Sequence, residues 1–149
     1  MTLEEFTQQL ENKQDSIEIL QLKELKNICG EEILFECLRD FYMIAYEAEP
    51  IINKDGTVLG NFLDSSIKRA QKSFDRLLSF VDEKVYSKEK VFYIISTNYK
   101  LASNEQERKE RRLFNKNKNK DLSGYWGSSY DFNKISPNVI LKIKELFNV

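Results

Sequence analysis

The stretch Glu31-Glu-Ile-Leu-Phe-Glu-Cys-Leu-Arg-Asp-Phe-Tyr-Met-Ile-Ala-Tyr-Glu-Ala-Glu49 carries the strongest helical pattern in the chain. Its apolar side chains recur at intervals of three and four residues, a spacing that places them on one face of an α-helix. Pro50 follows, and a proline there ends a helix because it lacks the amide hydrogen and clashes with the preceding turn. The stretch therefore predicts a long helix that turns one face to a core. That face comprises Ile33, Leu34, Cys37, Leu38, Phe41, Ala45 and Ala48.

Two shorter helices are expected before this stretch. Thr2 and Glu5 form a capping box, which predicts a first helix that ends near Lys13. Asp15 and Glu18 form a second capping pair, and Gly30 is typical of a helix C-terminus. We expect the core-facing stripe of the second helix to be Ile17, Leu20, Leu25 and Ile28. Residues 17–22 also fit a short strand, which is the second-ranked interpretation.

Further helices are expected after the turn-rich residues 50–61. One apolar stripe at helical spacing predicts a long helix, and its members are Ile67, Ala70, Phe74, Leu77, Leu78 and Val81. Ser87 is the expected N-cap of the next helix, although the β-branched and aromatic run 91–97 keeps a strand open as an alternative. Ser103 and Gln106 form a third capping box, and Ser136-Pro137 is typical of the start of a last helix.

The predicted fold is mainly α: a single compact domain over residues 1–149 with six to seven helices. Residues 115–133 are expected to be a flexible or irregular, aromatic-rich loop before the C-terminal helix, because their first part lacks apolar side chains. The alternative is an α+β fold with short strands near 17–22 and 91–97.

The composition argues against most enzyme chemistry. The chain of 149 residues has no histidine, which excludes every mechanism that uses a Ser-His or Cys-His pair or a histidine-bound metal. Its two cysteines, Cys29 and Cys37, are interpreted as reduced, buried thiols. Acidic residues lie near one another at many places in the sequence, and solvated helix faces explain these pairs without a catalytic or metal site. We therefore expect a protein without catalytic function, cofactor or metal.

The chain also lacks the features of a secreted or membrane protein. Its first residues are acidic and polar, whereas a secretory signal needs a basic start and an apolar run. The longest apolar run, 91–95, is far shorter than the roughly 20 residues that cross a bilayer. A cytoplasmic protein without a membrane partner is expected.

The segment 108–132 is the main candidate for a binding site because it combines basic and aromatic side chains. Cations bind phosphates and aromatic rings stack on unpaired bases, while Tyr, Trp and Arg also dominate protein-binding hot spots. A third interpretation is a solvated helix followed by a loop that its aromatic residues anchor to the body. The candidate partner-binding residues are Arg108, Lys109, Arg111, Arg112, Lys116, Lys118, Lys120, Tyr125, Trp126 and Tyr130.

The leading hypothesis is a protein-interaction module or inhibitor that uses this segment or the acidic first third of the chain as its contact surface. Residues 1–60 hold 13 acidic and 5 basic side chains, whereas the total net charge is only −1. The hypothesis extends to a phage or mobile-element origin and to a target in host machinery, such as a nucleic-acid-processing or defence complex. Direct binding of RNA or single-stranded DNA through 108–132 is the alternative. No small-molecule substrate is expected, and a homo-oligomer remains open.

Overall fold

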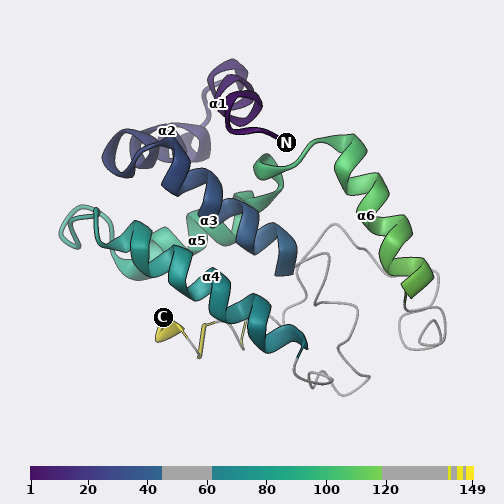
Figure 1. The fold of residues 1–149 in the computed structure, drawn as a ribbon. Coiled ribbons are helices and arrows are strands. Elements are labelled where there is room, and N and C mark those ends of the chain that lie inside the picture. Colours follow the sequence, from purple (N-terminus) through teal and green to yellow (C-terminus); the bar gives the residue numbers. More distant parts are fainter. Residues whose placement is uncertain (45–61, 119–140, 142–143, 146) are drawn as a thin grey trace.

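The computed structural model describes residues 1–44 and 62–118, together with 141, 144, 145 and 147–149. Every regular element in these residues is a helix (Figure 1). The order is α1 Leu3–Asn12, α2 Ile17–Cys29, α3 Glu31–Met43, α4 Phe62–Leu78, α5 Lys88–Asn98, the 3-10 helix η3 Tyr99–Ala102 and α6 Glu105–Lys118. The mainly α prediction is confirmed. The strand alternative is wrong, because residues 17–22 lie in α2 and 91–97 in α5.

Helix α3 lies at the centre of this arrangement. It contacts α1, α2, α4, α5 and η3, and Figure 1 shows it running through the middle of the body. Leu34, Cys37, Leu38 and Phe41 on the predicted face are buried, and Ile33 is half-buried. Other faces of the helix are covered too, because Phe35, Asp40 and Tyr42 are also buried. Ala45 and Ala48 lie outside the described residues.

Four phenylalanine rings from four separate parts of the chain meet beside α3. Phe41 on α3 contacts Phe92 edge to face, with ring centroids 5.8 Å apart. Phe74 on α4 lies 6.5 Å from Phe41 and 5.9 Å from Phe92. Phe147 completes the cluster at 6.0 Å, 5.3 Å and 6.0 Å from these three rings. These separations are favourable for aromatic pairs, so the cluster ties the C-terminal region to the helical body.

The α4 stripe is largely as the sequence predicts, and the described part of the last helix is helical. On α4, Ile67, Ala70, Phe74 and Leu77 are buried and Leu78 is half-buried. Val81 also packs half-buried against the core, but it lies in the turn after the helix ends, three residues beyond Leu78. The described residues of the predicted last helix, 141, 144, 145 and 147, are helical. Its other residues lie outside the described part of the chain.

Two capping predictions are confirmed and two are wrong by one residue. The Thr2 hydroxyl accepts from the Glu5 amide and the Ser87 hydroxyl from the Lys90 amide, as expected. Helix α2 instead begins after Ser16, whose hydroxyl accepts from the amide of Ile19, because the Asp15 carboxylate is bound to Lys23 at 2.7 Å. At α6, the Asn104 side-chain oxygen accepts from the amide of Glu107 at 2.8 Å. Ser103, the predicted cap, donates instead to the carbonyl of Lys100.

The predicted core stripe of α2 is also wrong. Ile17, Leu20 and Ile28 are exposed to solvent, and the buried side chains are Ile19, Leu22, Leu25 and Cys29. Only Leu25 belongs to both sets. Helix α2 thus carries apolar side chains on two faces, and the body covers one of them.

The segment after α5 departs from the prediction in one respect. Helix α5 tightens into η3, and α6 then continues to Lys118. Residues 115–118 are therefore helical, not part of an irregular loop. Residues 119–133, including the aromatic part of that segment, lie outside the described residues.

The connection between α2 and α3 depends on Gly30. This residue ends one helix and precedes the next, with φ +92° and ψ 153°. That backbone conformation is essentially restricted to glycine, since a Cβ atom clashes with the main chain there. The neighbouring space is open, so the constraint comes from the backbone itself.

We expect Gly30→Ala to lower the free energy of unfolding by about 1–3 kcal/mol, because alanine must adopt this strained conformation. Urea denaturation followed by circular dichroism measures the change. Asn27→Ala, at an exposed position of α2, is the matched control and should change stability by less than about 0.5 kcal/mol. Equal stability of the two variants would contradict the argument.

Candidate functional site

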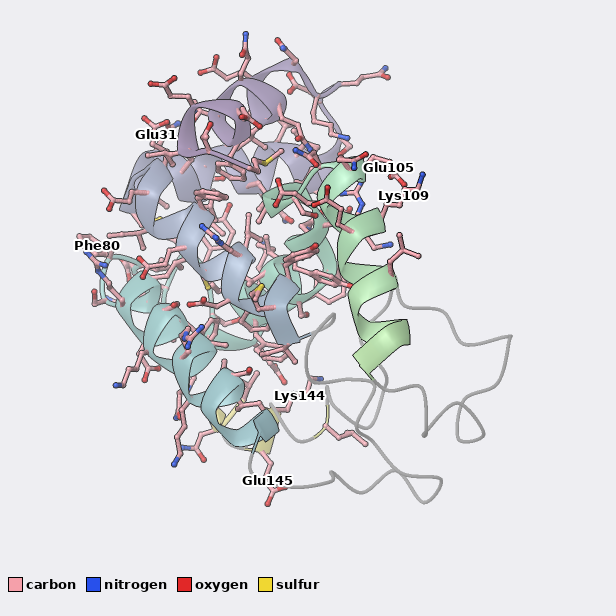
Figure 2. The ribbon with its side chains drawn as sticks, turned by 45° about the vertical axis from the view of Figure 1, so that its right-hand side comes forward. Glu31, Phe80, Glu105, Lys109, Lys144 and Glu145 are labelled. Atoms are coloured by element: carbon pink, nitrogen blue, oxygen red, sulfur yellow. The ribbon has the colours of Figure 1, made fainter. Side chains whose placement is uncertain are left out.

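Helix α6 carries the described part of the predicted basic segment. Lys109 is exposed at its outer side, where Figure 2 shows it beside Glu105. Arg111, Arg112, Lys116 and Lys118 lie on the same helix, although the structure does not describe their side chains. Lys120, Tyr125, Trp126 and Tyr130 lie outside the described residues. The structure therefore brings six of the seven basic residues onto one helix and leaves Lys120 and the aromatic part of the prediction untested.

Arg108 differs from the other candidates because its guanidinium is bound within the protein. One nitrogen donates to the carbonyl oxygens of Lys100 and Ser103, at 3.2 Å and 2.9 Å, and to the Ser103 hydroxyl. The other nitrogen pairs with Glu105 at 3.0 Å. Arg108 thus holds the end of η3 to the first turn of α6. We assign it a structural part in this junction. A separate ion pair joins the Met1 amino group to Glu107 in the first turn of α6.

An open groove of about 440 Å³ lies between α1 and the start of α3. Its lining combines one apolar residue with polar and acidic ones: Leu3, Glu4, Thr7, Gln8, Glu11 and Glu31. The Thr7 hydroxyl donates to the Glu31 carboxylate, which joins the two walls. Within the described part of the chain, no group of three or more acidic or cysteine side chains is arranged to hold a metal ion. The groove is therefore an acidic surface feature without a defined ligand.

The outer face of α2 is the more distinctive surface. Three large apolar side chains, Ile17, Leu20 and Ile28, are 77%, 52% and 36% exposed. Their positions along the helix place them on one side, with Gln21 and Glu24 between them. We call these five residues the α2 outer stripe. The sequence pattern already singled out its three apolar members but assigned them to the core.

Charged side chains of α2 take part in two ion pairs and one hydrogen bond. Lys23 pairs with Asp15 at 2.7 Å, and Lys26 approaches Glu11 at 3.7 Å. Glu24 accepts a hydrogen bond from the hydroxyl of Tyr86 at 2.5 Å. Burial and this carboxylate together raise the pKa of Tyr86 to about 12, so the hydroxyl stays protonated and the Glu24 charge is not neutralised by it.

The two cysteines are buried free thiols, as predicted. Burial raises the pKa of Cys29 to about 11 and that of Cys37 well above its ordinary value. A thiol is nucleophilic as the thiolate, which burial disfavours. Both side chains therefore act as apolar packing groups at neutral pH.

Asp40 is a polar group in the interface between α3 and α4. Its carboxylate accepts a hydrogen bond from the Ser73 hydroxyl, which also lies 3.2 Å from the carbonyl of Arg69. Burial raises the pKa of Asp40, and this outweighs the lowering by Ser73 and by the nearby Arg69 and Arg39. A single hydrogen bond from a neutral hydroxyl thus leaves the charged form less favourable than in water.

No protein-family model, curated protein or solved structure gives a significant match to this chain. The geometry of the described residues is therefore the basis for any functional argument. Among these residues, no helix has the length and apolar character that crossing a membrane requires.

The pKa of Asp40 predicts a pH dependence of stability. Because the folded state binds this proton more tightly than the unfolded state, stability is lost as the pH rises from about 3.9, the unfolded value, through the folded pKa. Asp40→Asn keeps an acceptor for Ser73 and removes the charge. It should be more stable than the wild type at neutral pH, and the difference should vanish in acid.

Urea denaturation at a series of pH values measures this difference. Asp75→Asn, at an exposed carboxyl on α4, is the control and should keep the wild-type pH profile. A wild type that is at least as stable as Asp40→Asn at neutral pH would show that the buried charge is better compensated than this interface indicates.

Proposed function

We propose that this protein is a non-catalytic protein-binding domain that contacts its partner through the α2 outer stripe. The observation that carries the proposal is the exposure of Ile17, Leu20 and Ile28 on one helix whose opposite face is in the core. Single exposed apolar residues are common, but a row of large ones along a helix is typical of a docking surface. The proposal keeps the protein-interaction hypothesis and locates the contact in the acidic first third.

Affinity capture from a lysate of the source organism, followed by mass spectrometry, tests this proposal. The wild type should retain a stoichiometric partner, and the double variant Ile17→Gln/Leu20→Gln should lose it. Both substitutions replace exposed side chains with a good helix former, so they should change folding stability by about 0.5 kcal/mol or less.

Leu113→Gln is the matched control for this experiment. Leu113 is 54% exposed on α6, almost the same fraction as Leu20, and α6 lies at the other side of the view in Figure 1. The control should retain the partner. Recovery of no stoichiometric partner, or equal recovery with the double variant, would contradict the proposed site.

A second candidate function is binding of RNA or single-stranded DNA through α6. The last eight residues of this helix, 111–118, contain four basic residues and no acidic one. Basic side chains on one exposed helix can track a phosphate backbone, and such binding weakens as salt displaces the contacts.

Fluorescence anisotropy with single-stranded oligonucleotides at several salt concentrations tests this candidate. Changing Lys109, Lys116 and Lys118 to Glu should abolish binding if α6 is the site, while Arg108 is left unchanged because it holds the η3–α6 junction. Absence of salt-dependent binding by the wild type would eliminate the candidate.

A further inference from the structure

The outer face of α4 carries a row of basic side chains. Lys68, Lys72 and Arg76 follow one another at intervals of four residues, and Arg69 lies three residues before Lys72. This spacing places all four on one side of the helix, opposite the side that packs into the core. All four side chains are exposed to solvent. We call these four residues the α4 basic face.

Most of this positive charge is uncompensated. Arg76 pairs with Glu36 of α3 at 3.3 Å, and the two side chains of this pair are 58% and 50% exposed. In the part of the chain that the structure describes, Lys68, Arg69 and Lys72 form no ion pair. Helix α4 as a whole has four basic residues and two acidic ones, at positions 64 and 75.

The acidic end of the protein points away from the α4 basic face. Helix α1 carries three glutamates and no basic residue. Figure 1 shows α1 and α4 on opposite sides of α3, and Figure 2 shows the same arrangement from another direction. A helix is about 10 Å across, and charges are screened within about 8 Å at physiological salt. The glutamates of α1 therefore weaken the positive potential at α4 very little.

The chemistry of the α4 basic face limits the kind of partner that fits it. Between residues 68 and 76, the exposed side chains are the four basic ones and Asp75, and the apolar side chains of this stretch are buried. Protein-binding hot spots need large anchors such as Tyr and Trp, and single-strand binders stack bases on aromatic rings. Helices that lie on membranes insert an apolar face, whereas the apolar face of α4 is in the core. The phosphate backbone of a duplex is bound by cations alone.

We infer that the α4 basic face binds the phosphate backbone of a nucleic-acid duplex, independently of base sequence. Lys68, Lys72 and Arg76 are each separated by about 6 Å along the helix axis, which is close to the distance between neighbouring phosphates of one strand. Each can therefore pair with a different phosphate, and Arg69 lies beside them. The inference goes beyond the proposed function and does not depend on the α2 outer stripe.

Fluorescence anisotropy with two short DNA duplexes of unrelated sequence tests the inference with the full chain. Both duplexes should bind with the same affinity at each salt concentration. Because each phosphate contact contributes about −0.9 to the slope of log affinity against log salt, three to four contacts predict a slope of about −3 to −4.

Lys68→Gln/Lys72→Gln removes two of these contacts and replaces exposed residues with a good helix former. It should weaken binding by about tenfold or more at physiological salt and make the slope shallower by about 2. Arg69 is left unchanged because it acts on the charge of Asp40. Lys13→Gln/Lys84→Gln changes the net charge equally at exposed positions outside α4 and should keep the wild-type slope.

A second pair of variants tests the opposite change. Glu36→Gln/Asp75→Asn releases Arg76 from its ion pair and removes the acidic side chain beside Lys72, so duplex binding should become about two- to fivefold tighter. Glu4→Gln/Glu5→Gln on α1 removes the same number of charges and should bind as the wild type does. Circular dichroism establishes that each variant is folded.

Several results would overturn the inference. They are no salt-dependent duplex binding at about 1 mM protein, an unchanged slope in Lys68→Gln/Lys72→Gln, or an equal loss in its control. Loss of binding on changing Lys109, Lys116 and Lys118 to Glu, with none in the α4 variant, would assign the duplex to α6. Tighter binding to polyglutamate or to phosphatidylserine vesicles than to the duplexes would assign the face to an acidic protein or to a membrane.

Discussion

The burial of α3 among the other helices is the constraint on which the rest of the structure depends. Helices α1, α2, α4 and α5 and the short η3 all contact it, so each must present an apolar face toward the same axis. This explains why Phe35 and Tyr42, outside the predicted stripe, are buried as well. The same burial places Asp40 of α3 in the interface with α4. There the Asp40 carboxylate has only Ser73 as a hydrogen-bond donor in the described structure, so its burial is unfavourable.

The charge asymmetry of the chain is used partly within the fold. Glu36 on α3 pairs with Arg76 on the basic helix α4 at 3.3 Å, and Arg69 acts on the carboxyl of Asp40. The Glu36–Arg76 pair is largely exposed, so it contributes little to stability. Helix α2 carries two carboxylates and two lysines, and both lysines pair with carboxylates that precede the helix, Asp15 and Glu11. The nearly neutral total charge thus conceals an acidic first third, part of whose charge pairs with basic side chains of the fold.

The sequence predicts well which segments form helices. It predicts less well which face of each helix is buried. The buried face of a helix with a single apolar side, such as α4, can be predicted from periodicity, because burying the other side would remove polar side chains from water. Helix α2 has apolar residues on two sides, and periodicity does not say which side the neighbouring helices cover. The N-caps of α2 and α6 were misplaced because two suitable residues are adjacent there, and an ion pair or an inward hydrogen bond decides between them. The surface that we propose for partner binding is this exposed side of α2, and the sequence pattern assigned it to the core because its apolar residues resemble a core stripe.

The position of Phe147 has a consequence for how the chain acquires its structure during synthesis. Its ring packs against Phe41, which lies 106 residues earlier, so this contact joins distant parts of the sequence. A nascent chain cannot close the four-ring cluster until residue 147 has left the ribosome, although α1 to α5 emerge before it. During that interval an apolar part of α3 and α4 is uncovered, and such a surface is prone to aggregation and open to chaperones.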